Sequence, residues 1–359
     1  MLWLLAVMAA PAAVASVLGT GLVLRALRRR AILDRPNERS SHDTATPIGG
    51  GLAVVAVIVF EWLLIWLLDS FGVLSFPYEV PLLLVIASGL AAVSWYDDLH
   101  GLKVSTRLLV QAAAVTAGLA TLSADGNIFQ GVLPYALDVV AAAFLWLWFI
   151  NLTNFMDGID GITGIEGGSI GLGVALLAAL AAAGSVIDNA SVAGVLAIYG
   201  IVLAAALAGF LVWNWRPAKI FLGDVGSVPI GFLLGWLLLE TAGSGLWAAA
   251  ILLPLYYLAD ATITLLLRAL RRERIFRAHR SHFYQRAARR FGSHATVVLA
   301  ILALNIGLIA LALISATREN AALPALAVGI VLTAGLLWYF GRNESGRDQS
   351  DGAPASQGP

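Results

Sequence analysis

Long apolar segments separated by short polar connections dominate the chain. Eleven of these segments approach the roughly 20 residues that a helix needs to cross a bilayer. They are centred near residues 2–24, 48–68, 80–96, 104–122, 133–150, 167–184, 192–213, 227–242, 246–267, 296–316 and 321–340. Small residues or short length weaken the fourth, sixth and eighth segments. The pattern predicts an all-α fold, a polytopic transmembrane helical bundle of about eleven spans.

These segments predict one integral-membrane domain over residues 1–341, with no solenoid repeat and no soluble domain. Residues 342–359 are polar and rich in Ser, Gly, Asp and Gln, a composition typical of disordered tails. The stretch from Met1 to Leu24 is apolar from its start and lacks a basic n-region. It therefore predicts a retained membrane helix rather than a cleaved signal peptide.

Composition agrees with a membrane protein and excludes several kinds of chemistry. The chain is 60% hydrophobic and 12% charged, whereas soluble domains carry about 25% charged residues. A soluble protein could not bury so much apolar surface. The absence of cysteine excludes disulfides, thiolate metal sites and cysteine nucleophiles together.

Basic residues set the expected orientation in the membrane. Of the 22 lysines and arginines, all except Arg318 lie on the connections that follow odd-numbered predicted spans or on the C-terminal tail. Cytoplasmic loops carry the excess of basic residues. The pattern predicts an external N-terminus and a cytoplasmic C-terminus, and it places every motif described below on the cytoplasmic side.

The first candidate motif is Asp97-Asp98, at the inner end of the third predicted span. Adjacent carboxylates repel each other, and a cation such as Mg²⁺ relieves that repulsion. The alternative is an ordinary solvated helix end.

The second motif is denser. It reads Asn151-Leu152-Thr153-Asn154-Phe155-Met156-Asp157-Gly158-Ile159-Asp160-Gly161. The two asparagines are three residues apart, as are the two aspartates, so each pair is adjacent on a helix. The two glycines predict a helix break and a backbone that wraps around a polar ligand. A purely structural polar turn needs neither the acids nor the amides at this density.

The third motif is Phe221-Leu222-Gly223-Asp224-Val225-Gly226-Ser227, directly before a predicted span. Its glycines allow close backbone approach, and the amides that open the next helix favour anions. Asp224 is thus placed as a metal ligand beside a phosphate. The alternative is an aspartate that caps the helix.

The fourth motif is the arginine-rich connection from Arg268 to Arg290, which contains His279, Arg280 and His282. Nine arginines accompany the single acid Glu273 there. Such a charge favours anionic lipid headgroups or ligand phosphates. Positive-inside anchoring is the alternative for many of these arginines.

Together, the motifs resemble the polyprenyl-phosphate N-acetylhexosamine-1-phosphate transferases. The resemblance covers roughly residues 34–285. It also includes Arg35-Pro36-Asn37-Glu38-Arg39-Ser40-Ser41-His42, Thr46-Pro47-Ile48-Gly49-Gly50-Gly51 and Asp260-Ala261-Thr262. In members that make the common N-acetylglucosamine lipid, several histidines stand close together in the last loop, whereas Tyr284 and Gln285 follow His282 here. The loop is closer to members that handle O-antigen sugars such as N-acetylfucosamine, and it lacks the histidine triplet of the muramoyl-pentapeptide enzyme.

The resemblance implies transfer of a sugar 1-phosphate from a UDP-N-acetylhexosamine to undecaprenyl phosphate, with release of UMP. It implies catalytic roles for Asp97, Asp98, Asp224 and His282, and substrate binding by Asn151, Asn154, Asp157, Asp160, Lys219, His279 and Arg280. Asp224, Asp98 and Asn154 are the expected Mg²⁺ ligands, with Mn²⁺ as the alternative ion. Asp97 is expected to orient the lipid phosphate rather than act as an obligatory base, because a phosphate monoester has its second pKa near 6.

Two other functions fit less well. A transporter places its binding groups near the midplane, whereas these motifs gather at the cytoplasmic ends of the spans and Asp260 alone lies deeper. An enzyme acting on CDP-alcohols needs a different spacing of aspartates. The expected location is the bacterial inner membrane, and the product is the lipid-linked first sugar of O-antigen or a related polysaccharide. Membrane lipids are further expected partners, nucleic acid is not, and a homodimer is one assembly that the sequence leaves open.

Overall fold

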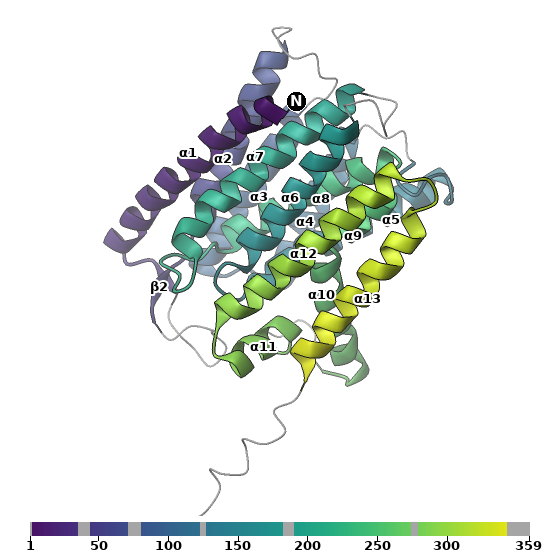
Figure 1. The fold of residues 1–359 in the computed structure, drawn as a ribbon. Coiled ribbons are helices and arrows are strands. Elements are labelled where there is room, and N and C mark those ends of the chain that lie inside the picture. Colours follow the sequence, from purple (N-terminus) through teal and green to yellow (C-terminus); the bar gives the residue numbers. More distant parts are fainter. Residues whose placement is uncertain are drawn as a thin grey trace, which may run out of the picture.

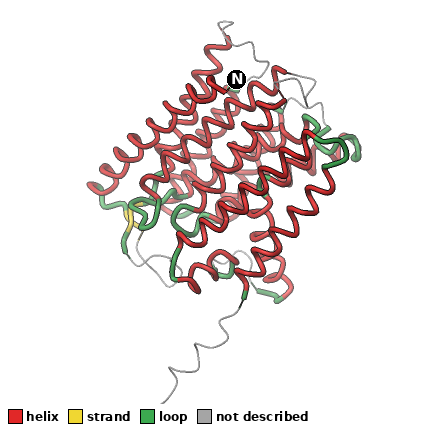
Figure 2. The backbone as a smooth tube through the Cα atoms, viewed as in Figure 1, coloured by secondary structure: helices red, strands yellow, loops and turns green. Residues whose placement is uncertain are grey.

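The computed structural model describes residues 2–34, 44–70, 80–122, 127–181, 190–273 and 279–342. These parts are helical except for loops and one short strand pair (Figure 2). The long helices are α1 (Leu2–Arg29), α2 (Gly51–Ser70), α3 (Pro81–His100), α4 (Val104–Gly118), α5 (Tyr135–Met156), α6 (Ile162–Leu180), α7 (Ala190–Asn214), α8 (Asp224–Gly243), α10 (Leu255–Leu270), α12 (His294–Thr317) and α13 (Ala322–Gly341). The short elements are β1 (Leu33–Asp34), β2 (Thr46–Pro47), the 3₁₀ turn η1 (Leu119–Thr121), α9 (Trp247–Leu252) and α11 (Phe283–Phe291).

Ten helices in the described part of the chain are long and apolar enough to cross a membrane. They confirm the predicted polytopic helical bundle and make the chain a multi-pass membrane protein. The ninth predicted segment differs, because it is divided into α9 and α10 around Leu253 and Pro254. Proline has no N–H for the helix ladder, and its ring clashes with the preceding turn. The predicted disordered tail, from residue 343 onward, and the Arg35–His42 motif lie outside the described residues.

Helix α8 forms the centre of the bundle and is buried along almost its whole length. Its small residues explain both its weak hydropathy and its position. A side chain at Gly231 would contact Thr153 of α5 at 3.0 Å, and one at Gly235 would overlap Trp146. The indole of Trp146 stacks on Phe232 of α8 at a centroid distance of 4.7 Å. Small residues at such interfaces allow close approach of helix backbones, so α8 lies against α5, and its first turn is held in a fixed place.

The loops that carry the motifs meet at one end of the bundle. Figure 1 shows β2 and α11 at this end and the start of α1 at the other. Strand β1 pairs with β2 in antiparallel register, and Ile48 bridges to Phe221. The carbonyl oxygen of Phe221 accepts hydrogen bonds from Gly49 N at 3.1 Å and Gly50 N at 2.8 Å. Two glycine-containing motifs far apart in sequence are thereby joined just before α8 begins.

Candidate active site

Asp97 and Asp98 end α3 and point to different neighbours. Successive residues on a helix are rotated by about 100°, so the pair cannot face one ligand together. Asp97 Oδ1 accepts the backbone N–H of Leu102 at 2.5 Å, and the Asp97 carbonyl accepts that of Gly101 at 2.8 Å. Gly101 adopts φ +72°, in the left-handed region that glycine favours. Asp97 therefore fixes the tight turn into α4 with one oxygen, while its second oxygen faces Arg107 of α4.

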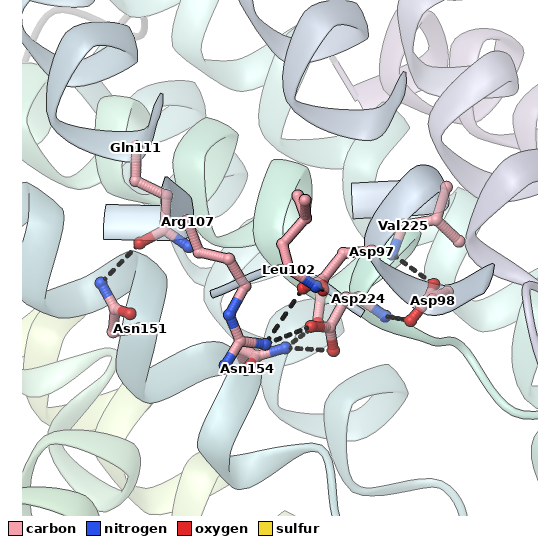
Figure 3. A network of polar contacts seen from close by, with 10 residues as sticks. Asp97, Asp98, Leu102, Arg107, Gln111, Asn151, Asn154, Asp224 and Val225 are labelled. Carbon is pink, nitrogen blue, oxygen red and sulfur yellow. Dashed lines mark hydrogen bonds and ion pairs between the residues drawn. The ribbon is translucent and has the colours of Figure 1, made fainter. Parts of the chain in front are cut away.

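Arg107 of α4 joins two of the predicted catalytic acids (Figure 3). Its Nη1 lies 3.1 Å from Asp97 Oδ2 and 3.2 Å from Asp224 Oδ2. Asp97 is nearly buried, whereas Arg107 and Asp224 are partly exposed. Two carboxylate oxygens from different helices thus converge on a single cationic position.

Asp224 is the first residue of α8, and its side chain does not cap that helix. Gly223 occupies the N-cap position, and the Asp224 carboxylate faces Arg107 on one oxygen. Its other oxygen accepts a hydrogen bond from Asn154 Nδ2 at 2.7 Å, and the same nitrogen lies 2.9 Å from Ser227 Oγ. The helix-capping alternative for Asp224 is therefore wrong, because its carboxylate belongs to a polar network between α4, α5 and α8.

Asp98 performs the capping instead. Its two carboxylate oxygens accept the backbone N–H groups of Asp224 at 3.1 Å and Val225 at 3.0 Å (Figure 3). A carboxylate at a helix N-terminus satisfies unpaired donors and is favoured by the helix dipole. Gly223 has φ +78°, and a side chain there would come within 2.8 Å of Asp98 Oδ2. This explains why glycine precedes Asp224.

The two asparagines of the second motif lie on the last turns of α5. Asn151 Nδ2 donates to Gln111 Oε1 of α4 and to Leu147 O, both at 2.8 Å. Asn154 binds Asp224 as described above. The predicted break follows directly, because α5 ends at Met156 and Gly161 adopts φ +82° before α6. The amides therefore face α4 and α8, whereas the acids of this motif lie in the turn beyond α5.

A cavity of about 300 Å³ collects most of the predicted site residues. Its polar lining includes Ser94, Asp97, Arg107, Gln111, Asn151, Asn154, Asp224, His279 and His282. Apolar residues line the rest, among them Leu90 and Val93 on α3 and Leu108 on α4. The α3 residues 90, 93, 94 and 97 follow helical spacing along one face. The cavity is therefore polar at the end of the bundle and apolar further along α3.

Asp157 and Asp160 are not part of that lining. Burial raises the pKa of Asp157 to about 7; the Thr163 hydroxyl opposes the shift and the charge of Asp224 adds to it. Burial alone would also raise the pKa of Asp160, but His294 and the nearby Arg216 and Ala218 N–H lower it overall. Asp160 Oδ1 lies 3.4 Å from His294 Nδ1, and Oδ2 accepts Ala218 N at 3.2 Å. In this structure Asp160 connects the α5–α6 turn to the loop before α8.

His282 is held by Asp260, a fully buried carboxylate on α10. Nδ1 of His282 lies 3.2 Å from Asp260 Oδ1. The same carboxylate accepts Phe283 N and Tyr284 N, each at 3.0 Å, and thereby caps the start of α11. Tyr256 Oη and Thr264 Oγ1 complete its five donors, at 3.1 and 3.2 Å. Because a carboxylate only accepts, this arrangement places the proton on Nδ1 and leaves Nε2 for a ligand.

Tyr284 stands in the loop where members of the family that the motifs resemble have several histidines, and here it connects two helices. Its hydroxyl donates to Phe155 O at 3.1 Å, and its ring stacks on His282 at 5.6 Å. Burial, followed by the charges of Asp260 and Asp157, raises its pKa far above the usual value. A side chain at Gly158 would overlap the tyrosine hydroxyl. Tyr284 therefore ties α11 to the end of α5 as a neutral phenol.

Of the remaining predicted residues, one lines the cavity and two do not. His279 lines the cavity, stacks on His282 at 4.9 Å and lies 2.8 Å from Ser281 Oγ. Lys219 is exposed, with its amine 5.4 Å from the centre of the Trp213 ring. Arg280 lines a second pocket on the other side of the loop. The structure thus brings together six predicted residues around the cavity, with Asp98 directly behind it, and places Asp157, Asp160, Lys219 and Arg280 elsewhere.

Besides Ser94 and Ser227, three polar residues of the site region were not predicted as site residues. Arg107 and Gln111 are four residues apart on α4, and Arg107 was used only to orient the chain. Their spacing on one helical face, shortly after Asp97, was the available signal. Asp260 was noticed as part of a motif but received no role, because its partners lie 22 to 24 residues further along the chain.

Two carboxylate oxygens could contribute to a cation site. Asp97 Oδ2 and Asp224 Oδ2 already share one positive group, and carboxylate oxygens are ligands that Mg²⁺ accepts, although no group of three acidic or histidine side chains placed to hold a metal occurs among the described residues. Asp98 is less suited than predicted, since both of its oxygens already accept α8 backbone donors. The geometry favours Asp97 over Asp98 as the partner of Asp224.

Comparison with known proteins agrees with this architecture. The family model of glycosyl transferase family 4 matches residues 80–242, which run from the start of α3 to the end of α8. A decaprenyl-phosphate N-acetylglucosaminephosphotransferase of Mycobacterium tuberculosis is 30% identical, in an alignment covering 97% of this chain and 91% of that protein. A probable undecaprenyl-phosphate N-acetylglucosaminyl 1-phosphate transferase of Bacillus subtilis is 26% identical, covering 79% and 76%. An undecaprenyl-phosphate alpha-N-acetylglucosaminyl 1-phosphate transferase of Escherichia coli is 30% identical, covering 60% and 56%.

Fold and site define a multi-pass membrane protein with a carboxylate, amide and histidine site at one end of its helical bundle. Together with the alignment to the mycobacterial protein, which covers nearly the full length of both chains, they establish the family. The chain belongs to glycosyl transferase family 4, that of the polyprenyl-phosphate N-acetylhexosamine-1-phosphate transferases.

Proposed function

We propose that this protein transfers an N-acetylhexosamine 1-phosphate from a UDP-sugar to a polyprenyl phosphate. The polyprenyl phosphate in its own membrane would be undecaprenyl phosphate. The observation that carries the proposal is the cavity, in which an apolar wall leads to an acid, arginine and amide cluster. The names of the relatives support it, because each describes transfer of N-acetylglucosamine phosphate to a polyprenyl phosphate.

The acceptor lipid fits the shape of the cavity. Val93 and Leu90 lie on the same face of α3 as Asp97, about one and two turns deeper in the bundle, respectively. A prenyl chain can lie along this apolar face while its phosphate reaches Arg107. Arginine binds phosphate oxygens through charged, often bidentate hydrogen bonds. The lipid phosphate would then compete with Asp97 and Asp224 for the guanidinium.

The reaction forms one P–O bond and breaks another. An oxygen of the lipid phosphate attacks the sugar-bearing phosphorus of the UDP-sugar, the bond to the bridging oxygen breaks, and UMP leaves. The lipid phosphate is largely dianionic at neutral pH, since its second pKa is near 6, so it needs orientation more than deprotonation. Asp97 serves as the orienting group through its contact with Arg107.

Several negative charges meet in this reaction, and the barrier is therefore mainly electrostatic. Asp224 and Asp97, supported by Asn154, would hold Mg²⁺ or Mn²⁺, which neutralises the phosphates of the donor when bound. Asn151 and Gln111 offer amide groups for the nucleotide. His279 and His282 lie on the opposite wall of the cavity, where they can bind the donor phosphates or the sugar.

The proposal extends to cellular location. The protein would lie in the inner membrane of a bacterium. The end of the bundle that carries the site would face the cytoplasm, where UDP-sugars are made. The product would start O-antigen or a related cell-surface polysaccharide.

The reaction predicts UMP as the stoichiometric nucleotide product. Membranes containing the protein should release UMP and form a lipid-linked sugar diphosphate when given a UDP-N-acetylhexosamine and undecaprenyl phosphate. Testing a panel of UDP-N-acetylhexosamines, including N-acetylglucosamine and N-acetylfucosamine, identifies the sugar. Omission of the lipid phosphate is the control. Formation of UDP instead would indicate attack at the sugar carbon and contradict the proposal.

Orientation is tested with single cysteines, which the chain lacks. Cysteines at Ser105 and Ser293, at the site end, should resist a membrane-impermeant thiol reagent in intact cells. A cysteine at Val132, 81% exposed at the opposite end, should react. All three should react once the cells are permeabilised, which controls for accessibility. Labelling of the first two in intact cells would reverse the topology.

A further inference from the structure

A second pocket lies at the same end of the bundle, beside the site but separate from its cavity. It has a volume of about 360 Å³ and lies between α10 and α11. Five arginines contribute to its lining, namely Arg268, Arg271, Arg280, Arg286 and Arg289. Among the described residues that line it there is no carboxylate, and none of them lines the active-site cavity. The pocket is therefore a distinct, strongly positive hollow.

The spacing of these arginines concentrates their charge. Arg268 lies in the last turn of α10, and Arg271 directly follows that helix, three residues further along. Arg286 and Arg289 are also three residues apart, on one face of α11. Like charges at this spacing repel each other. Burial, then the charges of Arg280 and Arg286, lowers the pKa of Arg289, although an arginine stays protonated at neutral pH. Such an arrangement is stabilised by a bound anion.

Protein partners compensate part of this charge. Arg268 Nε donates to Glu273 Oε2 at 2.8 Å, and Arg286 Nη2 donates to Gly341 O at 2.6 Å. The lining of the pocket also includes the hydroxyl-bearing Thr264 and Ser281. Hydroxyls and guanidinium groups are all donors to phosphate oxygens.

The surface next to the pocket is apolar and faces outward. On α10, Ile263, Leu266, Leu267 and Leu270 are exposed, and Leu270 is 72% exposed. Leu267 also lines the pocket, together with Phe283 of α11. On a membrane helix, an exposed leucine strip contacts acyl chains. The pocket thus continues directly from a lipid-facing surface into a phosphate-binding lining.

We propose that this pocket binds the headgroup of an anionic phospholipid, such as phosphatidylglycerol or cardiolipin, with the acyl chains along the exposed face of α10. Basic pockets between membrane helices bind such headgroups. The lipid would connect α10, which carries Asp260, to α11, whose start follows His282. It would thereby help to hold the loop that carries His279 and His282, a role separate from substrate binding.

Lipid binding is measured on the purified full-length protein in detergent, by the rise in Tm on adding phosphatidylglycerol. Phosphatidylcholine with the same acyl chains tests the need for a negative headgroup. Inorganic phosphate, alone and as a competitor, tests whether a free anion is the ligand. We expect stabilisation by phosphatidylglycerol only. Equal stabilisation by phosphatidylcholine would overturn the proposal, and so would stabilisation by phosphate alone.

Substitution locates the site. Arg271→Gln combined with Arg289→Gln should weaken phosphatidylglycerol binding about 25-fold, since each arginine near an anionic lipid contributes roughly fivefold. The control is Arg28→Gln combined with Arg29→Gln, which removes the same charge. These two exposed arginines end α1 on the side of the bundle that carries the site, and their replacement should leave binding within about twofold. Equal weakening in both pairs would indicate general surface attraction and contradict a pocket.

A photoactivatable phosphatidylglycerol provides a readout that does not depend on the folding of a variant. Cross-linked to the unmodified protein, it should label peptides of α10 and α11 and be displaced by excess phosphatidylglycerol. Labelling confined to other helices would overturn the assignment.

Discussion

Asp224→Asn is expected to lower turnover by about 10²–10³-fold, by analogy with the loss of a single transition-state contact. The asparagine keeps the shape and can still accept the hydrogen bond from Asn154 at its Oδ1. It loses the charge that faces Arg107 and that would bind Mg²⁺. The partly exposed ion pair contributes only about 0–1 kcal/mol to stability, so the amount of folded protein should hardly change.

The measurement is UMP release at saturating Mg²⁺, in membranes with matched protein levels, followed by titration of Mg²⁺. The half-saturating Mg²⁺ concentration should rise in the variant. Glu319→Gln, which removes an exposed acid at the opposite end of the bundle, is the charge-matched control. Near-normal turnover in Asp224→Asn would remove Asp224 from the metal site and contradict this assignment.

Asp260→Asn is expected to reduce activity by about 10–100-fold, the usual cost of losing a group that orients a functional histidine. The two oxygens of Asp260 accept five donors, and either orientation of an asparagine amide turns its NH₂ toward some of them. His282 would lose the acceptor for Nδ1 or α11 would lose part of its cap. A buried donor without an acceptor costs about 1–3 kcal/mol, so stability should fall as well.

A double-mutant cycle separates positioning from stability. If Asp260 acts through His282, then Asp260→Asn and His282→Gln together should cost little more activity than either alone. Asp138→Asn is the matched control, because Asp138 is also fully buried and accepts Ile128 N and Phe129 N at the other end of the bundle. It should lower Tm without lowering turnover per folded molecule. Additive losses of activity in the cycle would reduce Asp260 to a structural role.

Local sequence signals were enough to predict ten membrane spans and six of the residues that line the cavity. Hydropathy identifies spans because each helix must by itself satisfy its backbone in lipid. Arginine placement grouped the motifs on one side, and the structure brings their loops to one end. Asn154 and Asp224 are 70 residues apart, yet each lies in a motif whose polar density was visible in sequence. Glycine placement predicted the break after α5 for the same local reason.

The division of roles among the acids needed the tertiary structure. Asp97 and Asp98 are indistinguishable as a sequence pair, but helix rotation turns one toward Arg107 and the other toward the start of α8. Only the packing of α3 against the start of α8 makes Asp98 a cap, and the room for its carboxylate depends on Gly223, more than 120 residues later. Arg107 and Asp260 received no site role from the sequence because their chemistry consists of contacts with other segments.

What the sequence determined by itself is thus the position of ten of the eleven predicted apolar helices and the end of the bundle at which the polar motifs gather. These depend on the transfer of each segment into lipid, a property of adjacent residues. The tertiary structure decided which carboxylates face the cavity, which ones cap helices, and how the arginines divide between the site and a second pocket. Those outcomes depend on close packing between helices, where the rotation of each helix is set by neighbours far along the chain.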